Sequence, residues 1–214
     1  MVEKEELLPP EVPKYNGILT ITEPVDVFGF DPHIFFKGNV YSARFTCDEL
    51  LTGDWTKGPA GTGEVDWTAG EANRPDLLTG ELAESWEMPD RETLIYHIRK
   101  GVHWQDKPPV NGREFTAEDA AFNIRRDYAK GGYRYIANHP LGKEPQSVTA
   151  LDRWTVEVKV PAEFFNYLAI AIGDYCEMVP PESVALYGDM KNWRNAVGTG
   201  PYLLTDYVPG SSLT

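Results

Sequence analysis

The sequence predicts a mixed α+β fold. Residues 93–98 and 154–160 alternate apolar and polar side chains with the period of a strand, and a turn precedes each run. Between them, residues 117–128 carry apolar side chains at helical spacing. A chain that contains both strand pairs and amphipathic helices belongs to the α+β class.

Composition limits the kinds of partner. The chain has 214 residues, with 33 acidic and 20 basic side chains and a net charge of −13. This charge argues against nucleic acid or an anionic membrane surface as a partner. The length allows one or two domains and a core that needs no disulfide. The longest apolar run, residues 164–172, is too short to span a bilayer.

The first third of the chain is predicted to be only partly regular. Residues 1–14 are rich in Glu, Lys and Pro and lack periodicity, which predicts a flexible tail. Residues 17–21 are predicted to form a strand, and a loop follows in which Pro24 and Gly29 interrupt regular structure. Residues 40–51 have the spacing of a helix.

Residues 52–80 form a long segment rich in Gly that contains Trp55 and Trp67. Two tryptophans in such a loop fit either of two roles. They can stack on a ligand ring as part of a lid, or they can pack as plugs that hold the loop to the body. The plug interpretation is the favoured one.

The central segment has the clearest pattern. Residues 83–87 and 93–98 are predicted to form a hairpin around Pro89, Asp90 and Arg91. Thr116 is predicted to open a helix, because Asp119 stands at the spacing of a capping box. Gly131 and Gly132 are predicted to end this element.

The last third is predicted to contain a second hairpin and two more helices. Residues 147–150 and 154–160 pair around Asp152 and Arg153. Pro161 starts a helix, apolar almost all round to residue 172, that is expected to be buried. A short helix follows Pro180. The segment Gly198-Thr199-Gly200-Pro201 lacks the full spacing of a phosphate-binding loop.

Several motifs, in this order, resemble one protein family. They are "GILTI", "FDPH", "LAESWE", "IYHIRKGVHWQD", "FTAEDAAFNI" and "VGTGPYLLTDYVPGSSLT". The sequence is similar to the family 5 extracellular solute-binding proteins, the receptors that hand peptides, nickel complexes or oligosaccharides to ABC importers. The resemblance covers most of the chain from about Tyr15 onward.

The resemblance implies an incomplete lobe of the type II periplasmic-binding-protein kind. Residues 15–44 and 194–214 are expected to be pieces of lobe I, and residues 45–193 its small α+β subdomain. Residues 202–208 are expected to pair beside residues 17–21. Lobe II is expected to lie outside this chain, so we expect weak or undetectable ligand affinity for the chain alone.

The implied function is that of the substrate-binding component of an ABC import system. It would capture peptides and deliver them to the permease by hinge closure. An oligosaccharide receptor of the same family and a stand-alone non-catalytic interaction module are the alternatives. The implied location is the periplasm or the outer face of the cytoplasmic membrane, as a monomer with a possible lipid anchor. A signal peptide is then expected to have been removed, with Met1 added for expression.

The resemblance also supplies candidate ligand contacts. Asp26, Val27 and Phe28 precede the Asp-Pro-His triplet and are expected to reach the ligand, although a solvated Asp26 and a core Phe28 fit the sequence equally well. Tyr133 and Tyr135 are expected near the cleft. For a sugar ligand, Trp55 and Trp67 would supply stacking faces.

Catalysis and metal binding find no support in the sequence. The four histidines show no arrangement with a nucleophile and an orienting acid, and no cofactor is expected. His97 and His103 could bind a metal, but two histidines without further ligands fit a strand pair better. Cys47 and Cys176 could form a disulfide, while two buried free thiols are the favoured interpretation.

Overall fold

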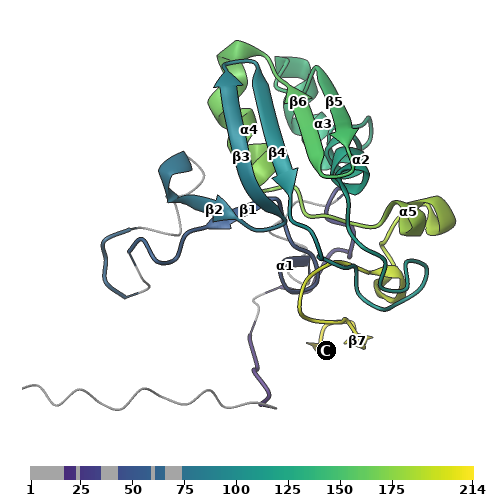
Figure 1. Cartoon of the computed structure of the whole chain (residues 1–214). Helices are drawn as coiled ribbons and strands as arrows, with labels where there is room; N and C mark the ends of the chain where they lie inside the picture. The colour runs from purple at the N-terminus through teal and green to yellow at the C-terminus, as the bar shows by residue number, and fades with distance from the viewer. Residues whose placement is uncertain (1–16, 23–24, 35–42, 59–60, 66–73) are drawn as a thin grey trace, which may run out of the picture.

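Four antiparallel strands form the main sheet, in the order β3-β4-β6-β5 (Figure 1). The strands are β3 (Ala83–Asp90), β4 (Thr93–Ile98), β5 (Ser147–Asp152) and β6 (Thr155–Lys159). The computed structural model that contains them describes residues 17–22, 25–34, 43–58, 61–65 and 74–214. β3 pairs with β4 and β5 with β6, which confirms both predicted hairpins. The two hairpins join where β4 lies against β6.

One face of this sheet is buried and the other is polar. Leu94 and Tyr96 of β4 are 1% exposed and stand opposite Val158 and Val156 of β6, which are fully buried. Because side chains alternate across a strand, the odd-numbered positions of β4 point to the other face. His97 is one of these and contacts Glu87 of the neighbouring strand at 2.8 Å. The predicted alternation is therefore confirmed.

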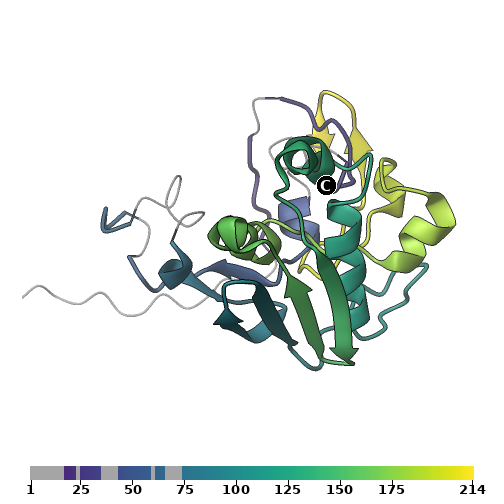
Figure 2. The ribbon, with the colours of Figure 1, turned by 90° about the horizontal axis from the view of Figure 1, so that it is seen from above.

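Two helices, α2 (Ala117–Asp127) and α4 (Phe165–Gly173), cover the buried face (Figures 1 and 2). The helix α3 (Tyr133–Asn138) follows α2 and lies farther from the sheet. The Tyr96 hydroxyl donates to the carbonyl of Ala169 on α4 at 3.3 Å, which links the sheet to that helix. Most of α4 is buried, as its apolar composition predicted, and the short 3-10 helix η5 (Ala162–Phe164) precedes it.

The start of α2 follows the predicted capping box. The amide of Thr116 donates to the carboxylate of Asp119 at 2.9 Å. Arg113 donates to both oxygens of Asp119, at 2.8 and 2.7 Å, and also to Glu182 of α5 (Pro181–Tyr187) at 2.7 Å. Through Arg113, the carboxylate that caps α2 is therefore also linked to α5. The helix ends at Asp127, before the predicted stop at Gly131.

The predicted helix over residues 40–51 is wrong for most of its described part. Only α1 (Ala43–Thr46) is helical, and β1 (Leu51–Gly53) pairs with β2 (Leu78–Gly80). Leu50 and Leu51 are both fully buried although they are adjacent. Leu50 directly precedes β1 and Leu51 is its first residue, and both belong to the larger apolar cluster. Residues 40–42 lie outside the described residues.

The expected strand at residues 17–21 is also wrong. Residues 17–22 are irregular and exposed, and within the described residues no strand pairs with them. Residues 202–206 are irregular as well, and β7 (Tyr207–Val208) pairs instead with β8 (Ser212–Leu213). Since a strand needs a neighbour to satisfy its amides, the apolar sequence alone does not make one here.

The remaining elements are short. They are the 3-10 helices η3 (Pro75–Leu77), η4 (His139–Leu141) and η6 (Trp193–Asn195). None of the helices in the described part of the chain is long and apolar enough to cross a membrane. In the described part of the chain, two separate apolar clusters fill the fold. The larger lies between the sheet and its helices, and the smaller contains Phe30, Ala196 and Leu204.

Candidate ligand-binding surface

Loop 25–34 carries three of the predicted ligand contacts. Asp26 is exposed, and its carboxylate accepts hydrogen bonds from the Tyr207 hydroxyl at 2.9 Å and the Gly210 amide at 2.7 Å. Val27 packs against the smaller apolar cluster. Phe28 is 65% exposed, so the alternative of a core phenylalanine is wrong. Of the three, Phe28 is the side chain that projects most freely from the loop.

The two predicted tyrosines lie on α3, and the structure brings one of them to this loop. The amide of Tyr133 donates to the carbonyl of His33 at 3.0 Å, and the Tyr133 side chain is half-buried. Tyr135 instead stacks on His139, with ring centroids 4.3 Å apart and an interplanar angle of 15°. The start of α3 and the end of loop 25–34 are therefore in contact. We use the name loop–α3 surface for the candidate contacts that these two segments carry, residues 26–28 and Tyr133.

A buried network between the end of loop 25–34 and α2 was not predicted from the sequence. Arg126 of α2 donates to both carboxylate oxygens of Asp31, at 2.9 and 2.6 Å. The amide of Met190 donates to the same carboxylate at 3.0 Å. The triplet around Asp31 was correctly predicted to be structural. Arg126 gave no signal, because its partner lies 95 positions away in the sequence.

The charges in this network are fixed by their surroundings. Burial opposes ionisation of Asp31, but hydrogen bonds and the charge of Arg126 outweigh it and lower the pKa of the carboxyl. Burial, assisted by the positive charge of Arg126, lowers the pKa of His33 to about 4. Nδ1 of His33 lies 2.9 Å from Arg126, which can only donate. His33 is therefore neutral, and its Nε2 carries the proton and donates to the carbonyl of Glu177 at 2.8 Å.

The tryptophans predicted for a sugar site are not brought to the loop–α3 surface. Trp55 follows β1, and β1 and β2 extend to the opposite side of the molecule from loop 25–34 (Figures 1 and 2). Its side chain is 55% exposed. Trp67 lies outside the described residues.

The Gly-rich segment that resembles a phosphate loop has a structural role. A Cβ on Gly198 would lie 1.8 Å from the carbonyl oxygen of Thr46, so only glycine allows this approach. The side-chain amide of Gln105 lies within hydrogen-bond distance of the carbonyls of Thr46, Gly200 and Tyr202, at 3.3, 2.9 and 2.7 Å. The glycines therefore serve the packing of three main-chain segments.

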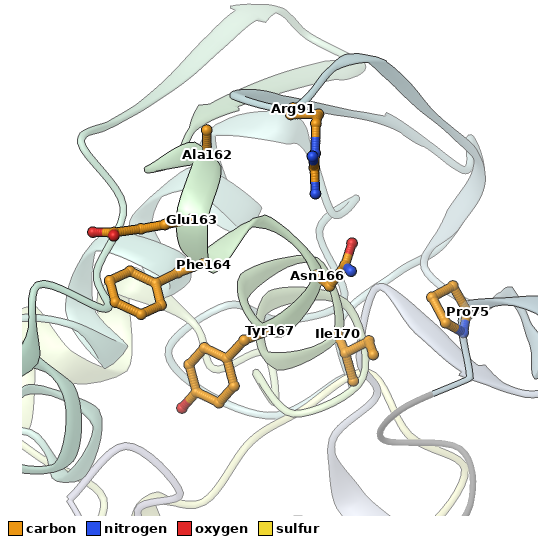
Figure 3. A pocket seen from close by; sticks show the side chains of 8 residues that line it. All are labelled: Pro75, Arg91, Ala162, Glu163, Phe164, Asn166, Tyr167 and Ile170. Carbon is orange, nitrogen blue, oxygen red and sulfur yellow. The ribbon is translucent and has the colours of Figure 1, made fainter.

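A surface pocket of about 460 Å³ lies beside α4, away from the predicted contacts (Figure 3). It is lined by Pro75, Arg91, Ala162, Glu163, Phe164, Asn166, Tyr167 and Ile170. Arg91 and Asn166 point toward one another, whereas Glu163 points away. A binding site needs polar groups that converge on a ligand, and this pocket does not supply a convergent set.

The histidines considered for a metal site and the two cysteines have separate surroundings. His97 pairs with Glu87, and Nδ1 of His103 lies 2.7 Å from the carbonyl of Gly112. Within the described ranges, no three metal-ligating side chains gather at one point. Cys47 and Cys176 are free thiols, as favoured, although only Cys176 is fully buried and Cys47 is half-buried. The partial burial of Cys47 raises the pKa of its thiol to about 12.

Comparison with known proteins gives one family. Residues 78–214 match the family described as bacterial extracellular solute-binding proteins, family 5, middle region. The matched region contains the whole main sheet, the helices that cover it and the terminal hairpin β7–β8.

Individual relatives agree with this match. The dipeptide-binding protein of Escherichia coli is 28% identical over 204 residues, with 86% of this chain and 34% of that protein covered. The periplasmic oligopeptide-binding protein OppA of the same organism is 28% identical over 140 residues, with 59% and 25% covered. The chain thus spans about a third or less of the length of these relatives.

A solved structure shows the same fold. The periplasmic binding protein DppA of Helicobacter pylori, in complex with the peptide STSA, superposes with a TM-score of 0.63 at 22% identity. The superposition covers 88% of this chain and 36% of that one. At this identity the likeness shows the fold, here a mixed α+β arrangement that aligns with part of a larger binding protein.

Proposed function

The chain belongs to the bacterial extracellular solute-binding proteins, family 5, and from this premise we propose that it is part of a peptide receptor. The receptor is the substrate-binding component of an ABC import system. It captures peptides outside the cytoplasmic membrane and delivers them to the permease by hinge closure. The family consists of solute-binding proteins that do not catalyse a reaction.

The observation that carries the peptide assignment is that the relatives found by sequence are named for peptides. The Escherichia coli dipeptide-binding protein and OppA are named for peptides, and the Helicobacter pylori DppA structure holds one. OppA is periplasmic by name, which supports a location outside the cytoplasmic membrane for this chain.

The two apolar clusters support the proposed division into domains. The larger cluster draws almost all of its residues from the proposed small subdomain, residues 45–193. The smaller one joins Phe30 to Ala196 and Leu204, which come from the two proposed pieces of lobe I, residues 15–44 and 194–214. Sequence-distant segments that share a separate core belong to one structural unit.

The exposed apolar side chains support a larger lobe I. Ile18 is 97% exposed and Leu19 76%, and in the second proposed piece of lobe I Tyr202 is 57% exposed and Leu203 50%. Contiguous exposed apolar side chains mark a contact surface. We propose that they pack against the remainder of a lobe I that is larger than the described residues.

The loop–α3 surface is the proposed ligand contact of this chain. Phe28 offers an exposed apolar face, and Tyr133 adjoins the loop through its amide. Asp26 and Val27 contribute mainly by holding the loop, since both contact the segment that ends the chain. Tyr135 is a secondary candidate because its ring already stacks on His139.

Native mass spectrometry of the protein isolated from its own cells tests the proposal. It reports the mass of the whole chain and of any retained ligand together. We expect a chain much larger than 24.1 kDa that carries a peptide adduct. A sugar adduct would replace the peptide assignment with the oligosaccharide alternative. A bare chain of 24.1 kDa would favour the stand-alone module.

A further inference from the structure

One guanidinium fixes two residues of loop 25–34. Nη1 and Nη2 of Arg126 donate to Oδ1 and Oδ2 of Asp31, and Nη1 also donates to Nδ1 of His33. Asp31 is fully buried, His33 is 1% exposed and the side chain of Arg126 is 14% exposed. Water therefore has little access to compete for these contacts.

His33 extends this constraint to α3. Its carbonyl accepts the hydrogen bond from the Tyr133 amide, while its Nε2 donates to the carbonyl of Glu177. A Cβ on Gly132 would lie 3.3 Å from the same His33 carbonyl, so the chain segments are in contact there. A single residue thus connects Arg126 to Tyr133.

We propose that Arg126 is a positioning residue of the ligand site, which holds the end of loop 25–34 against the start of α3, the two segments that carry Phe28 and Tyr133. This inference rests on the proposed function. Arg126 does not touch the ligand. It acts through Asp31 and His33.

The geometry of the guanidinium accounts for this role. A planar guanidinium that donates two parallel hydrogen bonds to a carboxylate has one preferred orientation, which a lysine ammonium does not share. The additional bond to His33 then fixes the imidazole ring and its tautomer. The same helix offers a matched control. Arg125 donates to the carbonyl of Val148 and lies 3.9 Å from Glu118, and neither partner belongs to the network.

Hydrogen exchange in the 214-residue chain tests the positioning role without a ligand. In Arg126→Gln we expect the amides of Tyr133, His33 and Ile34 to exchange at least about tenfold faster, since the latter two bond to Asp31 and a buried charged partner is lost. Amides of β4 and β6 should keep their rates. Arg126→Lys should fall between Arg126→Gln and the native chain, and Arg125→Gln should leave the Tyr133 amide unchanged.

Other outcomes would overturn the inference. Equal acceleration of the β4, β6 and Tyr133 amides would show that Arg126 supports the whole fold and not this junction. An unchanged Tyr133 amide would show that the junction does not depend on Arg126. If Arg126→Gln fails to fold, Arg126→Lys and Asp31→Asn provide the same comparison, with the same expected local acceleration.

A binding measurement in the complete receptor separates this inference from the proposed function. Dialanine and trialanine are the probes. We expect Arg126→Lys to bind the peptide at least about tenfold more weakly, because the two halves of the surface are no longer held together, and Arg125→Gln to bind like the native receptor. If exchange changes as expected but no variant, native included, binds either peptide, the peptide assignment fails while the structural junction stands. Native affinity in Arg126→Lys with a loosened junction would overturn the positioning role.

Discussion

The Tyr207 hydroxyl donates a hydrogen bond to the Asp26 carboxylate at 2.9 Å, although 181 positions separate the two residues. The amide of Gly210, in the turn between β7 and β8, donates to the same carboxylate oxygen. These two hydrogen bonds, that of Gly210 first, lower the pKa of Asp26 and keep it ionised. The final hairpin is therefore attached to loop 25–34 by an exposed but doubly bonded carboxylate.

Removing this carboxylate should loosen the hairpin. In Asp26→Ala we expect the Gly210 amide to exchange faster because both hydrogen bonds are lost, and in Tyr207→Phe we expect a smaller increase because one remains. Peptide affinity in the complete receptor should fall more in Asp26→Ala than in Tyr207→Phe. A large loss of affinity in Asp26→Ala with unchanged exchange at Gly210 would instead show that Asp26 contacts the ligand directly.

Gln105 should be sensitive to loss of its amide. In Gln105→Glu a carboxylate would face the carbonyl oxygens of Thr46, Gly200 and Tyr202. The hydrogen bonds from the side-chain amide would be lost, and the carboxylate would repel these oxygens. We expect the free energy of unfolding to fall by about 2–4 kcal/mol. Urea unfolding measures this change. Gln105→Met, which keeps the size without the charge, should cost less, and equal costs would contradict the expectation.

Gly198 should tolerate no side chain. In Gly198→Ala the new methyl group would overlap the carbonyl of Thr46, which is backbone and cannot move aside cheaply. We expect a loss of about 3 kcal/mol or more in stability, or no folded protein. Gly17→Ala is the control, because nothing lies within 4 Å of its Cβ position. Similar melting temperatures for the two variants would count against the close approach.

Asp127 should make stability depend on pH. Burial raises its pKa to about 7, and the charge of Arg134, whose Nε lies 3.4 Å away, only partly opposes this. The folded state then binds more protons than the unfolded state between the ordinary value of 3.8 and about 7. The contribution of Asp127 is present below pH 3.8 and is lost as the pH rises through 7.

Asp127→Asn should therefore gain stability relative to the native chain as the pH rises from about 4 to about 7 and stay level above this range. Urea unfolding at a series of pH values measures the difference. The pKa of His33 is lowered to about 4, so its contribution to stability changes with pH in the opposite direction. The two contributions therefore partly cancel in the pH dependence of the native chain, and the comparison with Asp127→Asn is needed to separate them. A stability difference between Asp127→Asn and the native chain that does not change with pH would refute the assignment.

Trp55 distinguishes the two ligand classes. If the receptor binds peptides at the loop–α3 surface, Trp55→Ala in the complete receptor should leave peptide affinity unchanged, because β1 lies on the other side of the molecule. Calorimetric titration with trialanine and with a linear oligosaccharide measures both. Sugar binding that disappears in Trp55→Ala would support the oligosaccharide alternative through ring stacking.

Local patterns predicted most of the main sheet and its helices. The alternation in β4 and β6, the capping box at Thr116 and the apolar run of α4 each depend on neighbours within a few residues. These predictions were correct because the folded chain buries the apolar face that each pattern predicts. The β1–β2 ribbon was not predicted, since Leu51 and Gly80 are far apart in the sequence. The expected strand at residues 17–21 failed for a related reason, because a strand depends on a partner.

The sequence by itself determined the family, the mixed α+β class and the hairpins, since motifs and periodicity are properties of short segments. Tertiary structure alone decided which groups meet. It joined Arg126 to Asp31 and His33, set Tyr133 beside loop 25–34, attached Asp26 to Tyr207 and left Phe28 exposed. The physical reason is that hydrogen bonds and ion pairs act over a few ångströms, whatever the separation along the chain, and only the folded chain brings such distant groups within that range.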